Sequence, residues 1–260
     1  MSVWEALILG IVQGATEFLP VSSSGHLVMT QAVLSIDISG VLFEVAVHLA
    51  TLLSILVVYR ARVADLTRGA MRGDAENLRY IGMIIVATIP AGLLGVLAKD
   101  RIEVLFDNPY VPGFALIVTG AILWSSRSAL RRATGMQPTW SVAALIGVAQ
   151  AFALVPGISR SGTTVVVALW LGLEAREAAA FSFLMAVPAI AGAAVLQIPE
   201  LGDLASLSKT ALIVGGVAAA VTGVLAIRTF VAMLGREAFH LFAPYCWLVG
   251  SAYLVFLSIR

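Results

Sequence analysis

Two apolar segments of this 260-residue chain share a sequence pattern, and each is interrupted by proline, serine and glycine. The segments start at Gly10 and Gly147, and sixteen aligned positions contain five identities, where chance would give about one. The identical pairs are Gly10/Gly147, Gln13/Gln150, Ser22/Ser159, Ser24/Ser161 and Gly25/Gly162. In each segment an apolar helical run is broken and then resumes. This pattern indicates broken helices that meet at a buried polar site.

The composition places these segments in a membrane. Hydrophobic residues make up 60% of the chain and charged residues 12%, whereas a soluble domain has about half and about a quarter. The net charge of +1 gives no indication of a nucleic-acid partner. The single cysteine, Cys246, cannot form an internal disulfide, and its apolar neighbours predict that it is buried. The sequence therefore predicts an all-α polytopic membrane protein.

Six apolar runs are long enough to cross a bilayer, which requires about 20 residues. These runs cover residues 43–60, 78–98, 110–126, 177–198, 209–232 and 238–258. The two interrupted segments, 2–35 and 141–172, are interpreted as re-entrant helical hairpins that enter and leave the membrane by one face. The alternative is that the two helices of each segment both cross the membrane completely. The chain then also returns to the side from which it entered, so the sides predicted for the other loops do not change.

The order of these elements predicts two related halves. Residues 1–140 and 141–260 each contain one hairpin followed by three transmembrane helices. Because three is odd, the second hairpin must enter from the face opposite to the first. The expected architecture is an inverted-topology repeat within one integral membrane domain.

Basic residues indicate the orientation of the chain in the membrane. In this topology eleven basic residues lie on one side of the membrane, five of them in the loop 60–79, and four basic residues lie on the other side. The eleven are Arg60, Arg62, Arg68, Arg72, Arg79, Arg127, Arg131, Arg132, Arg176, Arg228 and Arg236. The four are Lys99, Arg101, Lys209 and Arg260. The arginine-rich side is therefore expected in the cytoplasm, with the first hairpin and the C-terminus opening to the outside.

Arg160 is the most informative residue of the second segment. A membrane-embedded arginine is costly and needs a polar partner, and its guanidinium suits a phosphate or a carboxylate. The segment after Pro156 is predicted to start a new helix, whose first N–H groups favour an anion. The hydroxyl groups around it belong to Ser159, Ser161, Thr163 and Thr164. Together these features predict a phosphate-binding site, and the alternative is a purely structural Arg160–Glu17 pair.

The first segment has no arginine but contains Glu17, His26 and the three serines Ser22, Ser23 and Ser24. A serine near a histidine could accept a phosphoryl group with the histidine as its base, or the histidine could itself be the nucleophile. The other interpretation of the serines is that they cap the helix after the proline. One of the three is expected to do only that.

Gln13 and Glu17 lie four residues apart on one helix face, and their oxygens could hold Mg²⁺ or Ca²⁺ beside a phosphate. Glu44 and His48 form another pair with this spacing, either behind the site or at the membrane interface. The glycines and alanines of residues 215–220 predict close helix packing.

The motifs Gln13-x-x-x-Glu17-Phe-Leu-Pro-Val-Ser-Ser-Ser-Gly-His26 and Pro156-Gly-Ile-Ser-Arg-Ser-Gly-Thr-Thr164 resemble those of the bacterial undecaprenyl-diphosphate phosphatase (bacitracin-resistance) family. Phe181-Ser-Phe-Leu-Met-Ala-Val-Pro188 and the Phe43-Glu44 pair resemble it too, and the resemblance covers the whole chain. It implies an inner-membrane enzyme that removes the terminal phosphate of a C55 polyprenyl diphosphate and so recycles the lipid carrier of cell-wall synthesis. It also implies an inverted repeat, a divalent cation, and an active site that faces the periplasm.

Carried over by position, the resemblance assigns functional roles to Glu17, Ser23, His26, Ser159, Arg160 and Thr164. We expect catalytic roles for Glu17, Ser23, His26 and Arg160. We expect substrate contacts from Ser22, Ser24, Ser159, Ser161, Thr163 and Thr164. The metal ligands are expected to be Glu17 and Gln13. Many members of the family have Glu where this chain has Gln13, and a neutral amide binds a hard cation more weakly than a carboxylate.

A transporter or flippase of polyprenyl phosphate is the competing prediction, because inverted repeats with broken helices are the usual architecture of secondary transporters. The expected partners are the polyprenyl diphosphate substrate and membrane lipids. The sequence leaves open the nature of the nucleophile, the cation, the preferred prenyl length, and the oligomeric state, for which a homodimer is one option.

Overall fold

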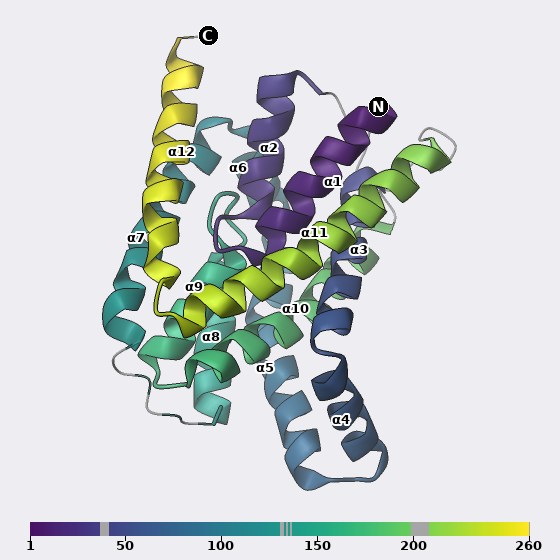
Figure 1. Ribbon diagram of the computed structural model, residues 1–260, viewed down its shortest axis with the longest axis vertical. Helices are drawn as coiled ribbons and strands as arrows, with labels where there is room; N and C mark the ends of the chain where they lie inside the picture. Colours follow the sequence, from purple (N-terminus) through teal and green to yellow (C-terminus); the bar gives the residue numbers. More distant parts are fainter. Residues whose placement is uncertain (37–41, 131–132, 134, 136, 199–207, 260) are drawn as a thin grey trace.

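The computed structural model describes residues 1–36, 42–130, 133, 135, 137–198 and 208–259 (Figure 1). All the secondary structure in these residues is helical. The first half contains α1 (Val3–Phe18), α2 (Ser23–Leu34), α3 (Leu42–Val58), α4 (Arg60–Met71), α5 (Ala75–Leu97), α6 (Lys99–Asp107) and α7 (Tyr110–Leu130). The second half contains α8 (Trp140–Phe152), α9 (Arg160–Trp170), α10 (Ala175–Gln197), α11 (Lys209–Gly235), the 3₁₀ helix η3 (Phe239–Leu241) and α12 (Phe242–Ser258).

In the described part of the chain, five helices are long and apolar enough to cross a membrane. They are α5, α7, α10, α11 and the continuous stretch Phe239–Ser258. A sixth span results if α3 and α4, which are bent by 84° relative to each other, are counted together. The chain is thus a multi-pass membrane protein, and the helices start and end within a few residues of the apolar runs.

The arginine-rich stretch that we expected to be a loop contains the helix α4. It is amphipathic: Leu66 and Gly69 are buried, whereas Arg60 and Arg68 are exposed. A helix with one apolar stripe and one charged face can end a span and leave its arginines in water. Three residues of the orientation argument lie outside the described residues, namely Arg131, Arg132 and Arg260.

Both interrupted segments consist of two helices with a turn between them, α1–α2 and α8–α9. The N-cap residues are serines: Ser22 caps α2 and Ser159 caps α9, so the predicted helix after Pro156 is confirmed. The two turns contact each other, because the Gly157 N–H donates to Ser22 Oγ over 3.2 Å. The Ser161 hydroxyl also donates to the Leu19 carbonyl oxygen over 3.3 Å.

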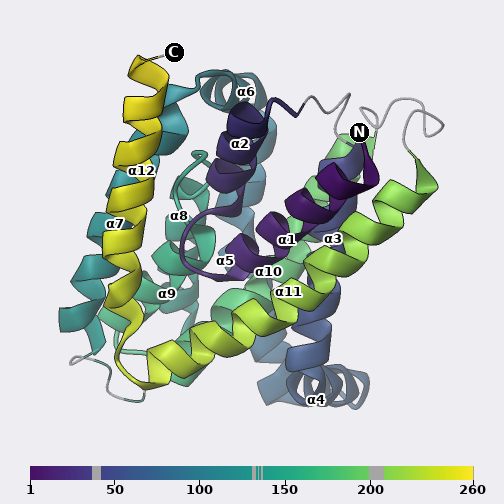
Figure 2. The same ribbon diagram turned by 45° about the horizontal axis from the view of Figure 1, so that its top comes forward.

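Helix α1 packs closely along α11, as Figure 2 shows. Gly10 and Gly14 face Gly215 and Ala219, and a Cβ atom on either α1 glycine would collide with the backbone of α11. This arrangement of small residues on both helices allows the backbones to approach each other. It confirms the packing role expected for residues 215–220.

A row of edge-to-face aromatic rings supports the end of α1 that carries Glu17. The Phe18 ring lies 5.6 Å from that of Phe183, which lies 4.9 Å from that of Phe230. Phe230 in turn lies 4.8 Å from Phe239. These fully buried side chains connect α1, α10, α11 and η3, so the position of Glu17 is fixed by the core. Cys246 is buried, as predicted.

The α1–α11 contact gives a test of the fold. We expect Gly14→Ala to lower the free energy of unfolding by about 1–3 kcal/mol, because the Ala219 carbonyl is backbone and cannot rotate away. The measurement is thermal unfolding in detergent. Gly92→Ala is the control, since a Cβ at this helical position meets no atom within 4 Å. Equal melting temperatures for the two variants would contradict the packing described.

Candidate active site

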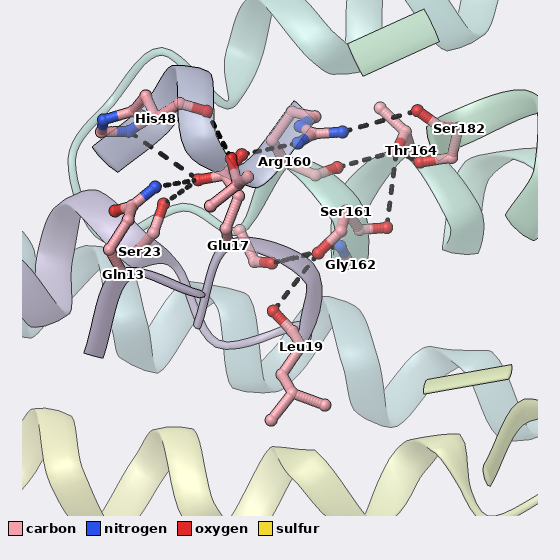
Figure 3. Close-up of polar contacts among 12 residues, drawn as sticks. Gln13, Glu17, Leu19, Ser23, His48, Arg160, Ser161, Gly162, Thr164 and Ser182 are labelled. Atoms are coloured by element: carbon pink, nitrogen blue, oxygen red, sulfur yellow. Dashed lines mark hydrogen bonds and ion pairs between the residues drawn. The ribbon is translucent and has the colours of Figure 1, made fainter. Parts of the chain in front are cut away.

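Glu17 lies at the centre of a polar cluster between the two turns (Figure 3). Its Oε1 accepts a hydrogen bond of 2.7 Å from Arg160 Nη2. Its Oε2 accepts one of 2.5 Å from the Ser23 hydroxyl and one of 3.1 Å from Gln13 Nε2. The Glu17 side chain is only 7% exposed. Donors from α1, α2 and α9 therefore converge on one buried carboxylate.

Arg160 is the first residue of α9, and its side chain is held from two sides. Besides the bond to Glu17, Nη1 donates to the Ser182 carbonyl oxygen over 3.4 Å. Thr164 Oγ1 lies 2.8 Å from the Arg160 carbonyl oxygen and 2.6 Å from Ser182 Oγ. The Arg160 side chain is 16% exposed, so the guanidinium is not fully enclosed. Sequence reasoning missed Ser182, whose signal is a hydroxyl inside the apolar Phe181–Pro188 stretch.

The remaining hydroxyls of the second segment differ in their surroundings. Ser159 Oγ accepts the Gly162 N–H over 3.1 Å and also lies 3.3 Å from Ser161 Oγ. The Thr163 hydroxyl is buried and has no hydrogen-bond partner among the described residues. Ser159 and Ser161 thus hold the turn, whereas Thr163 keeps a free donor.

Thr119 on α7 is a second residue that sequence reasoning missed. Its hydroxyl donates to the Gly157 carbonyl oxygen over 2.8 Å and accepts the Ser159 N–H over 3.0 Å. Gly157 has φ +99°, a conformation that favours glycine. Thr119 therefore fixes the turn that precedes Arg160. A polar residue within an apolar span was the only signal for it.

Ser22 has the capping role that the sequence left open for one of the serines. Its Oγ accepts the Gly25 N–H over 3.4 Å and the Gly157 N–H over 3.2 Å, and lies 3.3 Å from Ser24 Oγ. Its φ of +68° is uncommon for a residue with a side chain, so tertiary contacts must hold this turn. With Ser22 as the cap, Ser23 becomes the first residue of α2 and its hydroxyl points at Glu17.

Among the described residues, the ring of His26 forms its hydrogen bonds with groups other than Ser23. Its Nδ1 lies 2.8 Å from the Ser22 carbonyl oxygen, and its Nε2 lies 2.9 Å from the Tyr245 hydroxyl. The Ser23 hydroxyl donates instead to the Glu17 carboxylate over 2.5 Å. The expected serine–histidine pair is therefore absent from this geometry, although both residues lie in the same turn of α2.

His48 comes closer to the site than its sequence position indicated. Its Nε2 lies 3.8 Å from Glu17 Oε2, and its side chain is 31% exposed. Glu44 instead accepts a hydrogen bond of 3.1 Å from Gln31 Nε2 and so connects α3 to α2. Of the two interpretations of this pair, His48 thus fits the one that places it beside the site.

The residues around Glu17 suit a hard cation. Gln13 Oε1 is buried without a hydrogen-bond partner among the described residues, and its amide lies beside Glu17 Oε2. Rotating the amide would place a second oxygen next to the carboxylate, and such oxygens are the ligands that Mg²⁺ and Ca²⁺ prefer. The described residues contain no group of three or more His, Cys, Asp and Glu able to hold a metal. Most ligands of such an ion would therefore be water or phosphate oxygens.

Comparisons with known proteins give one consistent result. The family model "Bacitracin resistance protein BacA" matches residues 6–252. The undecaprenyl-diphosphatase of Parvibaculum lavamentivorans is 42% identical over 260 residues, which cover 98% of this chain and 96% of the relative. Those of Methanobrevibacter smithii and Desulfatibacillum aliphaticivorans are 38% and 37% identical over 96% of this chain, and the alignments cover 96% and 97% of these relatives. The chain belongs to the bacitracin resistance protein BacA family.

Proposed function

We propose that this chain is an undecaprenyl-diphosphate phosphatase of the bacterial inner membrane. It hydrolyses undecaprenyl diphosphate to undecaprenyl phosphate and inorganic phosphate, and so recycles the lipid carrier of cell-wall synthesis. The observation that carries the proposal is the convergence of Ser23 and Arg160 on one buried carboxylate, Glu17. Full-length relatives named undecaprenyl-diphosphatase support it. Removal of phosphate from this lipid is the reaction by which we expect it to confer bacitracin resistance.

The proposed topology is an inverted repeat of residues 1–140 and 141–260, each with a re-entrant hairpin and three spans. The helix pairs α1–α2 and α8–α9 occupy equivalent places in the two halves. In Figure 1, α1 and α2 extend from their turn toward the end where the C-terminus lies, whereas α8 begins toward the opposite end. This supports opposed hairpins whose turns meet inside the membrane. With the arginine-rich side in the cytoplasm, the site opens to the periplasm.

The diphosphate binds beside Arg160 and the first turn of α9. An arginine has five N–H donors, and the hydrogen bonds of Arg160 among the described residues use Nη1 and Nη2. The N-terminal N–H groups of α9 and the free hydroxyl of Thr163 add further donors. Ser24, which is partly exposed on α2, supplies one from the other turn. These groups bind and orient the phosphates without changing the covalent structure of the substrate.

Ser23 performs the phosphoryl transfer. Its hydroxyl oxygen attacks the terminal phosphorus, and its proton passes to Glu17 Oε2, which already accepts that hydrogen over 2.5 Å. The bond from this phosphorus to the bridging oxygen breaks, and undecaprenyl phosphate leaves. Water then attacks the phosphorus of the phosphoserine, the bond from this phosphorus to Ser23 Oγ breaks, and inorganic phosphate leaves. Ser23 Oγ takes back the proton held by Glu17, which restores the carboxylate. The alternative nucleophile is His26, whose ring would first have to leave its contacts with the Ser22 carbonyl and Tyr245.

Glu17 and Gln13 would hold the divalent cation. A carboxylate beside a diphosphate is unfavourable because like charges repel, and a bound Mg²⁺ or Ca²⁺ supplies the neutralising positive charge. The amide of Gln13 adds an oxygen without adding a second negative charge. Arg160 Nη2, 2.7 Å from Glu17 Oε1, supplies positive charge at the other oxygen of this carboxylate.

The release of inorganic phosphate distinguishes a phosphatase from a transporter. Purified protein in detergent is expected to release inorganic phosphate from undecaprenyl diphosphate without any ion gradient. Arg160→Ala is expected to lower the rate about 100-fold, because it removes a donor that stabilises charge on the transferred phosphoryl group. Arg68→Ala, at an exposed site on α4, is the control and should retain the rate. Absence of phosphate release from the folded wild type would favour the transporter or flippase.

Removal of divalent metal ions tests whether the reaction requires the proposed cation. EDTA is expected to abolish phosphate release, and added Mg²⁺ or Ca²⁺ is expected to restore it. Gln13→Glu should lower the cation concentration that gives half-maximal activity, because a carboxylate binds a hard cation more tightly than an amide. Full activity in excess EDTA, or an unchanged cation requirement in Gln13→Glu, would contradict the assignment of these ligands.

A further inference from the structure

The contact between His26 and Tyr245 has no part in the reaction described so far. The two rings stack with an interplanar angle of 7° and a centroid distance of 5.8 Å. The His26 Nε2 and the Tyr245 hydroxyl oxygen are 2.9 Å apart. His26 is buried on α2, and Tyr245, on α12, is 42% exposed. The contact therefore joins the turn that carries the nucleophile to the last helix of the chain.

The partners of the imidazole determine which of its nitrogens carries the proton. The Ser22 carbonyl oxygen, 2.8 Å from Nδ1, can only accept a hydrogen bond, so Nδ1 must be the donor. In a neutral ring Nε2 is then an acceptor, and the Tyr245 hydroxyl donates to it. Both ring nitrogens are thereby engaged, in a chain of hydrogen bonds that runs from Tyr245 through His26 to Ser22.

This chain of hydrogen bonds ends at the backbone of Ser22, the residue that precedes the proposed nucleophile Ser23. Ser22 has the unusual φ of +68°, and its carbonyl is held by His26 while its hydroxyl caps α2. Ser23 is the next residue, with its hydroxyl 2.5 Å from Glu17. A change in the Ser22 carbonyl orientation would rotate the peptide that joins Ser22 to Ser23. The Ser22 carbonyl oxygen also accepts the His26 backbone N–H over 3.2 Å, so His26 holds it with both its backbone and its ring. The ring is held in turn by Tyr245.

We propose that Tyr245 is a positioning residue for phosphoryl transfer: through His26 it holds the Ser22 carbonyl and so keeps the Ser23 hydroxyl on Glu17. The inference rests on the proposed phosphatase function. It assigns the His26 ring to the support of the turn, with Nδ1 protonated, and gives α12 a direct part in the active site.

The test uses Tyr245→Phe, which keeps the stacked ring and removes only the hydroxyl. Its matched control is Tyr253→Phe on the same helix, because the Tyr253 hydroxyl is buried without a partner among the described residues. Steady-state kinetics give kcat and KM for phosphate release. ¹⁵N NMR of histidine-labelled protein reports the protonation of each ring nitrogen, and the chain has only three histidines to assign.

In the wild type, the His26 signals should show a protonated Nδ1 and an unprotonated Nε2. Tyr245→Phe should shift the Nε2 signal and lower kcat about three- to tenfold with KM within about twofold, as expected for one lost hydrogen bond. Tyr253→Phe should change neither. A protonated Nε2 in the wild type, an unchanged kcat, or a rise in KM alone would overturn the proposal, the last by showing that Tyr245 contacts the substrate. A wild type without phosphate release, but with the expected NMR signals, would contradict the phosphatase function and leave the hydrogen-bond chain standing.

Discussion

The ion pair between Glu17 and Arg160 is the interaction on which the site depends. The two residues lie 143 positions apart in the sequence, and their charged atoms are 2.7 Å apart in a largely buried environment. Either charge alone would be costly at this depth, because little water is present to solvate it. Together they join the α1–α2 turn to the α8–α9 turn. Removing either partner is therefore expected to disturb both the charge balance and the contact between the turns.

The two interrupted segments place different side chains at matching positions. Ser22 and Ser159 are both N-caps, so the following residues, Ser23 and Arg160, each begin a helix. Ser23 donates to one oxygen of Glu17 and Arg160 to the other. Ser23, the proposed nucleophile, and Arg160, which we propose binds phosphate, thus lie at matching positions of the two segments. The serines and glycines shared by the two segments build the turns, and we propose that the residues that differ between the segments carry the reaction.

The sequence predicted what depends on local physical chemistry. Proline followed by a capping serine defines where α9 begins, and hydrophobic length defines the spans. Most side-chain contacts between helices could not be obtained this way, although the Arg160–Glu17 pair and the packing of residues 215–220 were among the expectations. Nothing in the spacing shows that Thr119 faces the second turn or that Ser182 supports Arg160, because both depend on how α7 and α10 are rotated. The sequence suggested His26 as the base for a nearby serine for the same reason. Nothing in it indicated that the hydroxyl of Tyr245, 219 residues away, would form a hydrogen bond with His26 Nε2.

We propose that Ser23, activated by Glu17, accepts the phosphoryl group, so a phosphoserine should form in each turnover. Rapid quenching of a single turnover with undecaprenyl diphosphate labelled in the terminal phosphate would capture the phosphoryl-enzyme for mapping by mass spectrometry. We expect an acid-stable phosphoserine at Ser23, which is lost in Ser23→Ala and retained in Ser24→Ala. Acid-labile phosphohistidine at His26 would contradict it, and so would label on any other residue.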